Sequence, residues 1–279
     1  MYLELLKQIL SIVNRENDLN GNNIVEKIKG QIKERCSSTY EEWSNKNFDI
    51  NYKFIHNGYS DKKKSTLLST AFLDNQENVV KALLAVDGIN VNFQYQLDKT
   101  LLHLAIEKGN EKIVEALLNK GARVDLKDVY GKAPLHLAIE KGDEKIVKAL
   151  LNKGASVDLK DVYGKAPLHL AIEKGDEKIV KALLNKGASV NLPDKSGSTP
   201  LHLAIRKGDE NIVNALLAVK GIDVNLRDSS ESAPLYLAAE KGKMEIVEAI
   251  LDKNPSIIIF QMNMDTLLCP LLLGDIIKR

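Results

Sequence analysis

The chain carries a hydrophobic pattern that returns at a fixed interval. In residues 124–157 (VDLKDVYGKAPLHLAIEKGDEKIVKALLNKGASV), apolar side chains gather over positions 135–139 and again over positions 146–151. Each group has the spacing of a helix with one buried face, so the pattern predicts two short helices. Gly142 and Gly154 follow these helices and are expected to end them, because glycine readily takes the positive φ of a helix C-terminus.

Polar residues mark the other boundaries of the same unit. Asp128 and Gly131 occupy the first and fourth positions of a predicted tight turn. Pro134 suits the first position of a helix, where its missing N–H costs nothing, and Asp143 can cap the second helix. One unit is therefore predicted to be a turn followed by two helices.

The same unit is repeated along the chain. Residues 157–190 copy residues 124–157 letter for letter. Self-similarity at this period predicts a stack of units in place of a single globular core. First helices are expected to open at six positions, spaced by 33 or 34 residues: Thr66, Thr100, Ala133, Ala166, Thr199 and Ala233. Four histidines follow the same interval: His103, His136, His169 and His202.

The segment from Asp194 to Ala204, DKSGSTPLHLA, and its counterparts resemble the ankyrin repeat. The resemblance implies a β-turn finger and two antiparallel helices in each repeat. The implied fold class is all-α, an ankyrin repeat solenoid of helix-turn-helix units with an N-terminal helical cap. The repeats look like those of ankyrin-repeat proteins from intracellular bacteria.

Three parts are predicted along the chain. Residues 1–48 match no repeat and are predicted to form two amphipathic helices and a short helix, which together cap the first repeat. Residues 49–265 hold six repeats, and the first finger is expected to carry an insertion over residues 52–64. Residues 266–279 are predicted to be a truncated capping repeat that opens at Thr266.

Composition narrows the function classes. The formal net charge is +1, from 39 basic and 38 acidic residues, so no nucleic-acid partner is expected, and polyanion binding at Lys62 to Lys64 is the disfavoured alternative. Cys36 and Cys269 have neither metal nor disulfide spacing and indicate a reducing compartment. No stretch approaches the roughly 20 apolar residues that span a bilayer, and no secretion signal is visible at the N-terminus. We therefore expect a cytoplasmic monomer without a membrane contact.

No catalytic, cofactor or metal site is expected. The sequence contains no nucleophile elbow, no H-E-x-x-H motif and no phosphate-binding glycine loop. Zinc ligands lie about 2 Å from the ion, whereas the resemblance places successive histidines one repeat apart and implies that they tie adjacent repeats through backbone or threonine groups. Ala133, Ala166 and Ala233 stand where the family has a capping threonine, and losing a cap typically costs about 0.5–2 kcal/mol.

The resemblance places partner binding on the finger tips and on the exposed ends of the first helices, which line a concave groove. The third and fourth repeats contribute Val129, Tyr130, Lys132, Glu140, Lys141, Val162, Tyr163, Lys165, Glu173 and Lys174. The fifth and sixth contribute Lys195, Arg206, Lys207, Glu240 and Lys241. Tyr130 and Tyr163 are the main candidates, because tyrosine is enriched at interface hot spots. The alternative is that each ring packs on the neighbouring finger.

These features predict a non-enzymatic protein–protein interaction module that binds a protein partner through the concave face. Near-identical repeats and a Lys-, Asn- and Ile-rich composition raise the hypothesis of a bacterial effector secreted into a host cytosol. The alternative is that residues 1–48 carry an activity and the repeats target it. Specific recognition is expected towards the fifth and sixth repeats or the inserted finger, because two identical copies have had little time to diverge.

Overall fold

The computed structural model describes residues 2–57 and 62–254. These residues are almost entirely helical, which confirms the predicted all-α repeat solenoid. Contacts divide the chain into two compact units, Met1–Val129 and Tyr130–Arg279. The truncated repeat predicted from Thr266 onward lies outside the described residues.

The first unit contains the first two repeats. Its helix pairs are α4 (Leu67–Leu73) with α5 (Glu77–Ala85) and α6 (Leu101–Glu107) with α7 (Glu111–Asn119). The finger before α4 is a hairpin of two antiparallel strands, β1 (Phe54–Asn57) and β2 (Lys62–Ser65). The hairpin occupies the segment in which the sequence predicts an insertion. A 3₁₀ turn, η1 (Gln96–Asp98), forms the tip of the next finger.

Three helices precede these repeats: α1 (Tyr2–Val13), α2 (Ile24–Arg35) and α3 (Ser37–Ser44). Helix α1 packs on α4, and α2 packs on α5. The side chain of Asn14 accepts hydrogen bonds from the backbone N–H groups of Asn78 and Val79, at 2.9 and 3.1 Å. Because these donors have no partner within α5 itself, Asn14 completes the start of that helix.

The only tryptophan joins the N-terminal helices to the first finger. The indole of Trp43 is fully buried and donates to the carbonyl oxygen of Asp49 at 2.8 Å. Its edge also meets the rings of Phe48 and Phe54. A buried indole with a satisfied N–H is typical of a packing residue.

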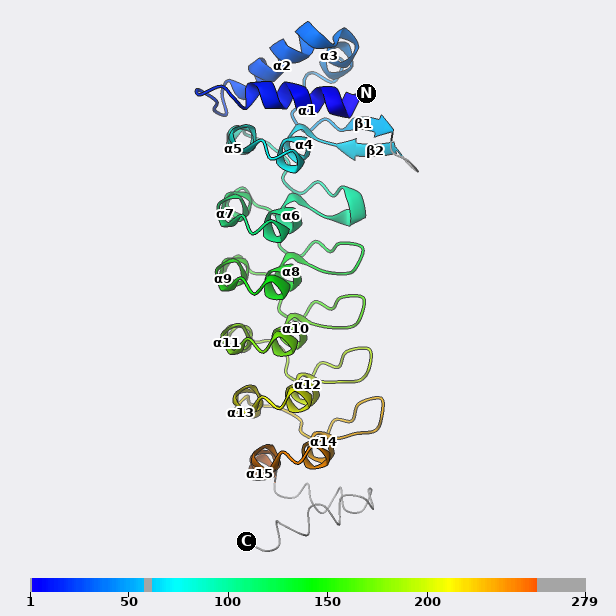
Figure 1. Ribbon diagram of the computed structural model, residues 1–279, viewed down its shortest axis with the longest axis vertical. Helices are drawn as coiled ribbons and strands as arrows, with labels where there is room; N and C mark the ends of the chain where they lie inside the picture. The colour runs from blue at the N-terminus through cyan, green and yellow to red at the C-terminus, as the bar shows by residue number, and fades with distance from the viewer. Residues whose placement is uncertain (1, 58–61, 255–279) are drawn as a thin grey trace, which may run out of the picture. The chain divides into compact units, whose positions relative to one another are not determined.

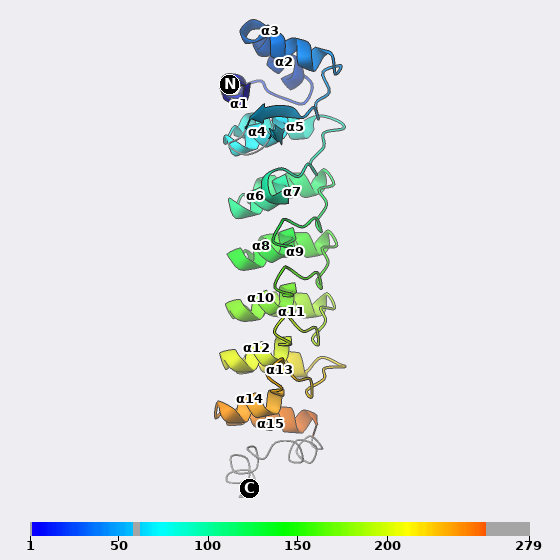
Figure 2. The same ribbon diagram turned by 90° about the vertical axis from the view of Figure 1, so that its right-hand side faces the viewer.

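The second unit contains the third to sixth repeats. Its helix pairs are α8 (Pro134–Lys141) with α9 (Glu144–Asn152), α10 (Pro167–Lys174) with α11 (Glu177–Asn185), α12 (Pro200–Lys207) with α13 (Glu210–Leu217), and α14 (Pro234–Glu240) with α15 (Met244–Lys253). First helices pack on first helices and second helices on second helices, which gives two layers (Figure 1). Figure 2 shows that the helices of this unit run crosswise to the direction in which its repeats are stacked.

The apolar stripe of each second helix forms the core between the layers. Ile146, Val147 and Leu150 in α9 are at most 2% exposed, and α11 repeats this burial at the equivalent positions. Burying a side chain of this size contributes about 1.5–3 kcal/mol. The 33-residue period therefore reproduces one core layer per repeat.

The first helices begin with capping residues at the predicted openings. Their N-caps are Thr66, Thr100, Ala133, Ala166, Thr199 and Ala233. The hydroxyl of Thr199 lies 2.7 Å from Nδ1 of His202. Ala166 has no hydroxyl, but its backbone N–H still donates to Nδ1 of His169 at 3.1 Å. The α10 N-terminus therefore keeps the hydrogen bond from the backbone N–H to the histidine but lacks the one from a threonine hydroxyl. Helix α14, after Ala233, begins without a side-chain cap.

Candidate protein-binding surface

Each finger of the second unit is closed by an aspartate. Asp161 accepts through Oδ1 from the backbone N–H groups of Tyr163 and Lys165, at 2.8 and 2.9 Å. Asp194 and Asp228 accept from the equivalent N–H groups of their own fingers, at 2.8 to 3.0 Å. A short side chain that accepts from its own turn favours that turn. The residues at the tips therefore have defined positions.

Neighbouring fingers of this unit are also bonded to one another. The N–H of Val162 donates to the carbonyl oxygen of Tyr130, and the N–H of Lys195 donates to that of Tyr163, both at 3.0 Å. The approach is so close that a Cβ on Gly164 would lie 2.8 Å from the backbone nitrogen of Lys195. Only glycine fits there, since φ is also +76°. The tips form a hydrogen-bonded ladder with fixed spacing.

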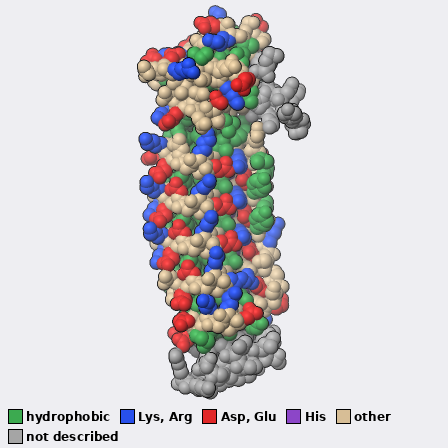
Figure 3. Space-filling model, viewed as in Figure 1, with side chains coloured by type: hydrophobic (Ala, Val, Ile, Leu, Met, Phe, Trp, Pro, Cys, Tyr) green, Lys and Arg blue, Asp and Glu red, His purple; other side chains and the backbone are tan. Residues whose placement is uncertain are grey.

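Three apolar tips of this ladder face solvent, and together we call them the finger strip: Tyr130, Val162 and Tyr163. Their exposed fractions are 49%, 39% and 63%. Hydrophobic side chains are visible along the finger edge in Figure 3. Packing on a neighbouring finger therefore leaves a large part of each side chain uncovered. Val129, another predicted contact, belongs to the first unit and is 46% exposed.

Four of the predicted contact residues are paired with one another. The Nζ atom of Lys132 lies 2.7 Å from Glu140, and that of Lys165 lies 2.6 Å from Glu173. Each pair joins a finger to the end of the first helix in the same repeat. These side chains are 23–34% exposed, and a pair at such a surface contributes about 0–1 kcal/mol. The pairs therefore orient the surface more than they stabilise the fold.

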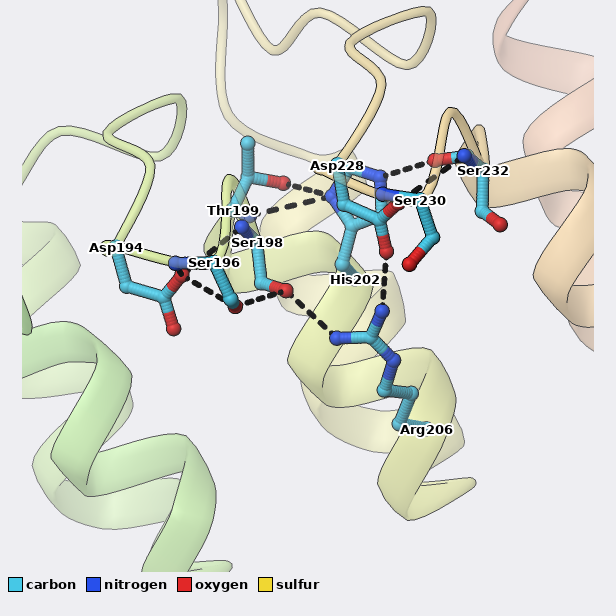
Figure 4. A network of polar contacts seen from close by, with 9 residues as sticks. All are labelled: Asp194, Ser196, Ser198, Thr199, His202, Arg206, Asp228, Ser230 and Ser232. Carbon is cyan, nitrogen blue, oxygen red and sulfur yellow. Dashed lines mark hydrogen bonds and ion pairs between the residues drawn. The ribbon is translucent and has the colours of Figure 1, made fainter.

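In the fifth repeat this pair is replaced by a link to the next finger (Figure 4). Arg206 donates through Nη1 to the hydroxyl of Ser198 at 2.6 Å and through Nη2 to the carboxylate of Asp228. The side chain of Asp228 is only 1% exposed. Burial would raise the pKa of Asp228, but the backbone N–H groups of Ser232 and Ser230 and the charge of Arg206 outweigh burial and lower it. The carboxylate is therefore ionised at neutral pH.

The predicted structural histidines are fully buried: His103, His136, His169 and His202. In the fourth repeat, Nδ1 of His169 accepts from Ala166, and Nε2 lies 3.0 Å from the carbonyl oxygen of Leu192, at the start of the next finger. Nε2 therefore carries the proton. Burial lowers the pKa of His169 and of His202. Both rings are neutral at pH 7, and His202 also reaches the next finger, with Nε2 3.0 Å from the carbonyl oxygen of Ser232.

The remaining predicted contacts lie at the exposed ends of the first helices and on the fifth finger. Lys141, Lys174, Lys207 and Lys241 are all exposed. No ion-pair partner is found for these four lysines among the residues that the structure describes. Lys195 and Glu240 are exposed as well. The surface thus combines an apolar strip, internally paired charges and unpaired lysines.

Two residues that shape this surface were missed by the sequence prediction. Asp228 anchors Arg206 from the next repeat. Lys243 reaches back towards the fifth repeat, since a Cβ on Gly208 would lie 3.0 Å from its Cε and 3.2 Å from its Nζ. A signal was present for both, because Arg206 stands where the preceding repeats have glutamate and Lys243 stands where they have the capping aspartate.

The part of the chain that the structure describes has neither a metal-binding cluster nor a membrane-spanning helix. Within residues 2–57 and 62–254, no three His, Cys, Asp or Glu side chains lie together in a way that could hold a metal ion. None of the helices in this part of the chain has the length and apolar character needed to cross a bilayer.

The repeat geometry agrees with a comparison against known families. The family model described as ankyrin repeats (3 copies) matches residues 43–128, 67–161, 135–228 and 168–263, more than half of the chain. The chain therefore belongs to the ankyrin repeat family. Ankyrin repeats generally mediate protein–protein interactions. No match is found among curated proteins.

Proposed function

We propose that the chain is a non-enzymatic module that engages a protein partner through the finger face of its second unit. The observation that carries this proposal is the finger strip, whose apolar side chains stay exposed on a hydrogen-bonded ladder. Contiguous apolar exposure of this kind marks interaction sites. Because the ladder already fixes the tips, a partner loses little free energy to ordering them.

The free energy gained by covering the finger strip alone is too small for stable binding. A tyrosine buries about 150–250 Å² in all, so covering the exposed half of Tyr130 and Tyr163 contributes about 4–6 kcal/mol at about 25 cal/mol/Å². Association costs roughly 4–15 kcal/mol in lost translational and rotational freedom. The exposed ends of the first helices therefore belong to the proposed surface together with the strip.

Affinity purification on the full chain, followed by mass spectrometry, would identify the partner. The variant Tyr130→Ala with Tyr163→Ala is expected to weaken its binding about 30-fold, corresponding to about 2 kcal/mol for hot-spot residues. The control is Leu73→Ala, which truncates a 47% exposed apolar side chain on α4 of the first unit. Unchanged affinity of the double tyrosine variant, with an unchanged circular dichroism spectrum, would refute the assignment of this face.

The N-terminal 48 residues are proposed to be a cap, not a separate active domain. Support comes from the packing of α1 and α2 on the first helix pair and from the bonds that Asn14 makes to the start of α5. Deleting residues 1–48 should therefore lower the melting temperature of the first two repeats. A deleted chain that melts like the full chain but loses a cellular activity would favour the alternative, a targeting array for an N-terminal activity.

The setting of this binding is proposed to be the cytosol, with a monomeric chain, and an effector role in a host cell is the finer hypothesis. The letter-for-letter repeat and the Lys-, Asn- and Ile-rich composition support the effector hypothesis. The tail Ile276–Arg279, compatible with an export signal, lies outside the described residues. A translocation assay on chains with and without the last 20 or so residues tests the tail, and equal delivery would remove it from the hypothesis.

A further inference from the structure

The summed charge at the ends of the first helices and at the N-caps of the second helices changes sign along the second unit. In the third and fourth repeats these positions carry two lysines against four carboxylates: Glu140, Lys141, Asp143, Glu173, Lys174 and Asp176. In the fifth and sixth repeats they carry four basic residues against two carboxylates: Arg206, Lys207, Asp209, Glu240, Lys241 and Lys243. Two exchanges produce the reversal, Arg206 for glutamate and Lys243 for aspartate.

Three of these basic side chains form what we call the lysine cluster: Lys207, Lys241 and Lys243. Lys207 and Lys241 are exposed, and Lys243 lies across Gly208, the residue after Lys207. No ion-pair partner for the three is found within the described residues. In Figure 3, Lys and Arg side chains, drawn in blue, gather on the lower part of the described surface, where the fifth and sixth repeats lie. Their charge is therefore available to a partner.

The nearby carboxylates offset the charge of the cluster only in part, because exposed Glu240, next to Lys241 in the sequence, balances one of the three lysines. Arg206 is occupied by Asp228, and the carboxylate of Asp209 accepts from the backbone N–H of Ile212 at 3.0 Å, at the start of α13. In the third and fourth repeats, the glutamates are likewise held by Lys132 and Lys165. The third and fourth repeats have two unpaired lysines beside two acidic caps, Asp143 and Asp176, whereas the fifth and sixth repeats have three, because Lys243 replaces one acidic cap.

We propose that the lysine cluster binds an acidic stretch of the same protein partner whose apolar side chain packs on the finger strip. The partner segment then has a direction: its apolar anchor lies on the third and fourth repeats, and its Asp or Glu residues lie on the fifth and sixth. Packed helices are about 8–10 Å apart, so two repeats separate anchor and acid by about 16–20 Å. An extended chain covers this with five or six residues at about 3.3 Å each. The inference rests on the proposed function.

The test selects a displayed library of random 16-residue peptides on the full chain. Enriched peptides should contain an aromatic or aliphatic residue and, five or six residues away, a group of Asp or Glu. Synthetic copies are then titrated against the natural chain and against Lys207→Glu with Lys241→Glu. About tenfold weaker binding is expected at low salt, and a smaller difference at 1 M salt, where charges more than about 3 Å apart are screened.

The repeats supply a matched control. Lys148→Glu with Lys181→Glu makes the same change of charge on the second helices α9 and α11 of the identical copies, outside the proposed surface, and is expected to alter the affinity less than twofold. The glutamine variants Lys207→Gln and Lys241→Gln should fall between the natural chain and the glutamate variant. All positions are exposed, so circular dichroism should show the same fold throughout.

The outcomes separate this inference from the proposed function. Peptides that need Tyr130 and Tyr163 but ignore the lysine variants would overturn the inference and leave the function standing. Peptides that ignore the tyrosines would overturn both, as would a library that yields no binder. A single-stranded oligonucleotide that binds as tightly as the peptides and competes with them would show a general polyanion surface and also overturn the inference.

Discussion

The identical third and fourth repeats and the diverged fifth repeat share one backbone but differ in their polar connections. In the copies, a lysine on the finger pairs with a glutamate on the helix of the same repeat. In the fifth repeat, the side chain of Arg206 extends from α12 and donates to the buried carboxylate of Asp228 in the next finger. Two exchanges, serine for lysine at Ser198 and arginine for glutamate at Arg206, therefore add a contact between repeats in place of the ion pair within one repeat.

This difference shows how a repeat protein can specialise without changing its fold. The copies supply a regular ladder with an apolar strip, whereas the fifth and sixth repeats add a link between fingers and a surplus of positive charge. Each repeat contacts only its neighbours in such an array. A local exchange can therefore alter the surface in one place and leave the remaining repeats intact.

The largest expected effect is a loss of stability when the link between the fifth and sixth repeats is removed. Arg206→Leu should destabilise the second unit by about 2 kcal/mol, because it removes the cation beside a carboxylate whose side chain is 1% exposed. The loss stays below that of a fully buried pair, since Asp228 keeps the N–H groups of Ser230 and Ser232. Lys165→Leu should cost less than about 1 kcal/mol, since that pair lies at the surface. Urea unfolding of both variants checks the ranking, and equal losses would contradict it.

A smaller effect should appear with acid, and it should be shared by both regions. Burial lowers the pKa of His169 and His202 below the usual histidine value of about 6.5. The unfolded chain therefore takes up protons first, so stability is complete above about pH 6.5 and falls below it, by at most about 1.4 kcal/mol per pH unit for each ring. The pKa of Asp228 is lowered from 3.8 in the folded chain, so Asp228 adds a further loss of stability only below about pH 3.8.

Thermal unfolding at several pH values between 7.5 and 5 measures this slope. His169→Gln and His202→Gln should each reduce the slope of stability against pH by the same amount. Each removes one buried ring, the first from a copied repeat and the second from the diverged fifth repeat. A slope that neither substitution changes would show that other groups bind the protons.

The smallest expected effect restores the missing caps. Ala166→Thr should stabilise the fourth repeat by about 0.5–1 kcal/mol, because the new hydroxyl can meet Nδ1 of His169 as Thr199 meets His202, at 2.7 Å. Ala233→Thr should gain less, since Tyr236 stands in the place of the histidine. Melting curves of the two variants test the order, and a larger gain at residue 233 would contradict this account of the cap.

Much of the fold could be predicted because its signals are local. Pro134 and its equivalents, the glycines after each helix and the finger aspartates act within a few residues, and the predicted openings coincide with N-caps. The pairings on the surface could not be predicted in the same way. Lys165 and Glu173 are eight residues apart, and Arg206 and Asp228 are 22 apart. Which charges meet depends on how far each side chain reaches across the finished stack.

The sequence by itself determined the repeat, its period, the helix boundaries and the apolar tips, because these follow from local propensities and from a pattern that recurs every 33 residues. Only the tertiary structure decided which of the predicted contacts are paired, that the side chain of Asp228 is buried where Arg206 meets it, and that Lys243 lies against Gly208. The physical reason is distance: electrostatic contacts are selected by proximity in space, and proximity between repeats exists only after the helices have stacked.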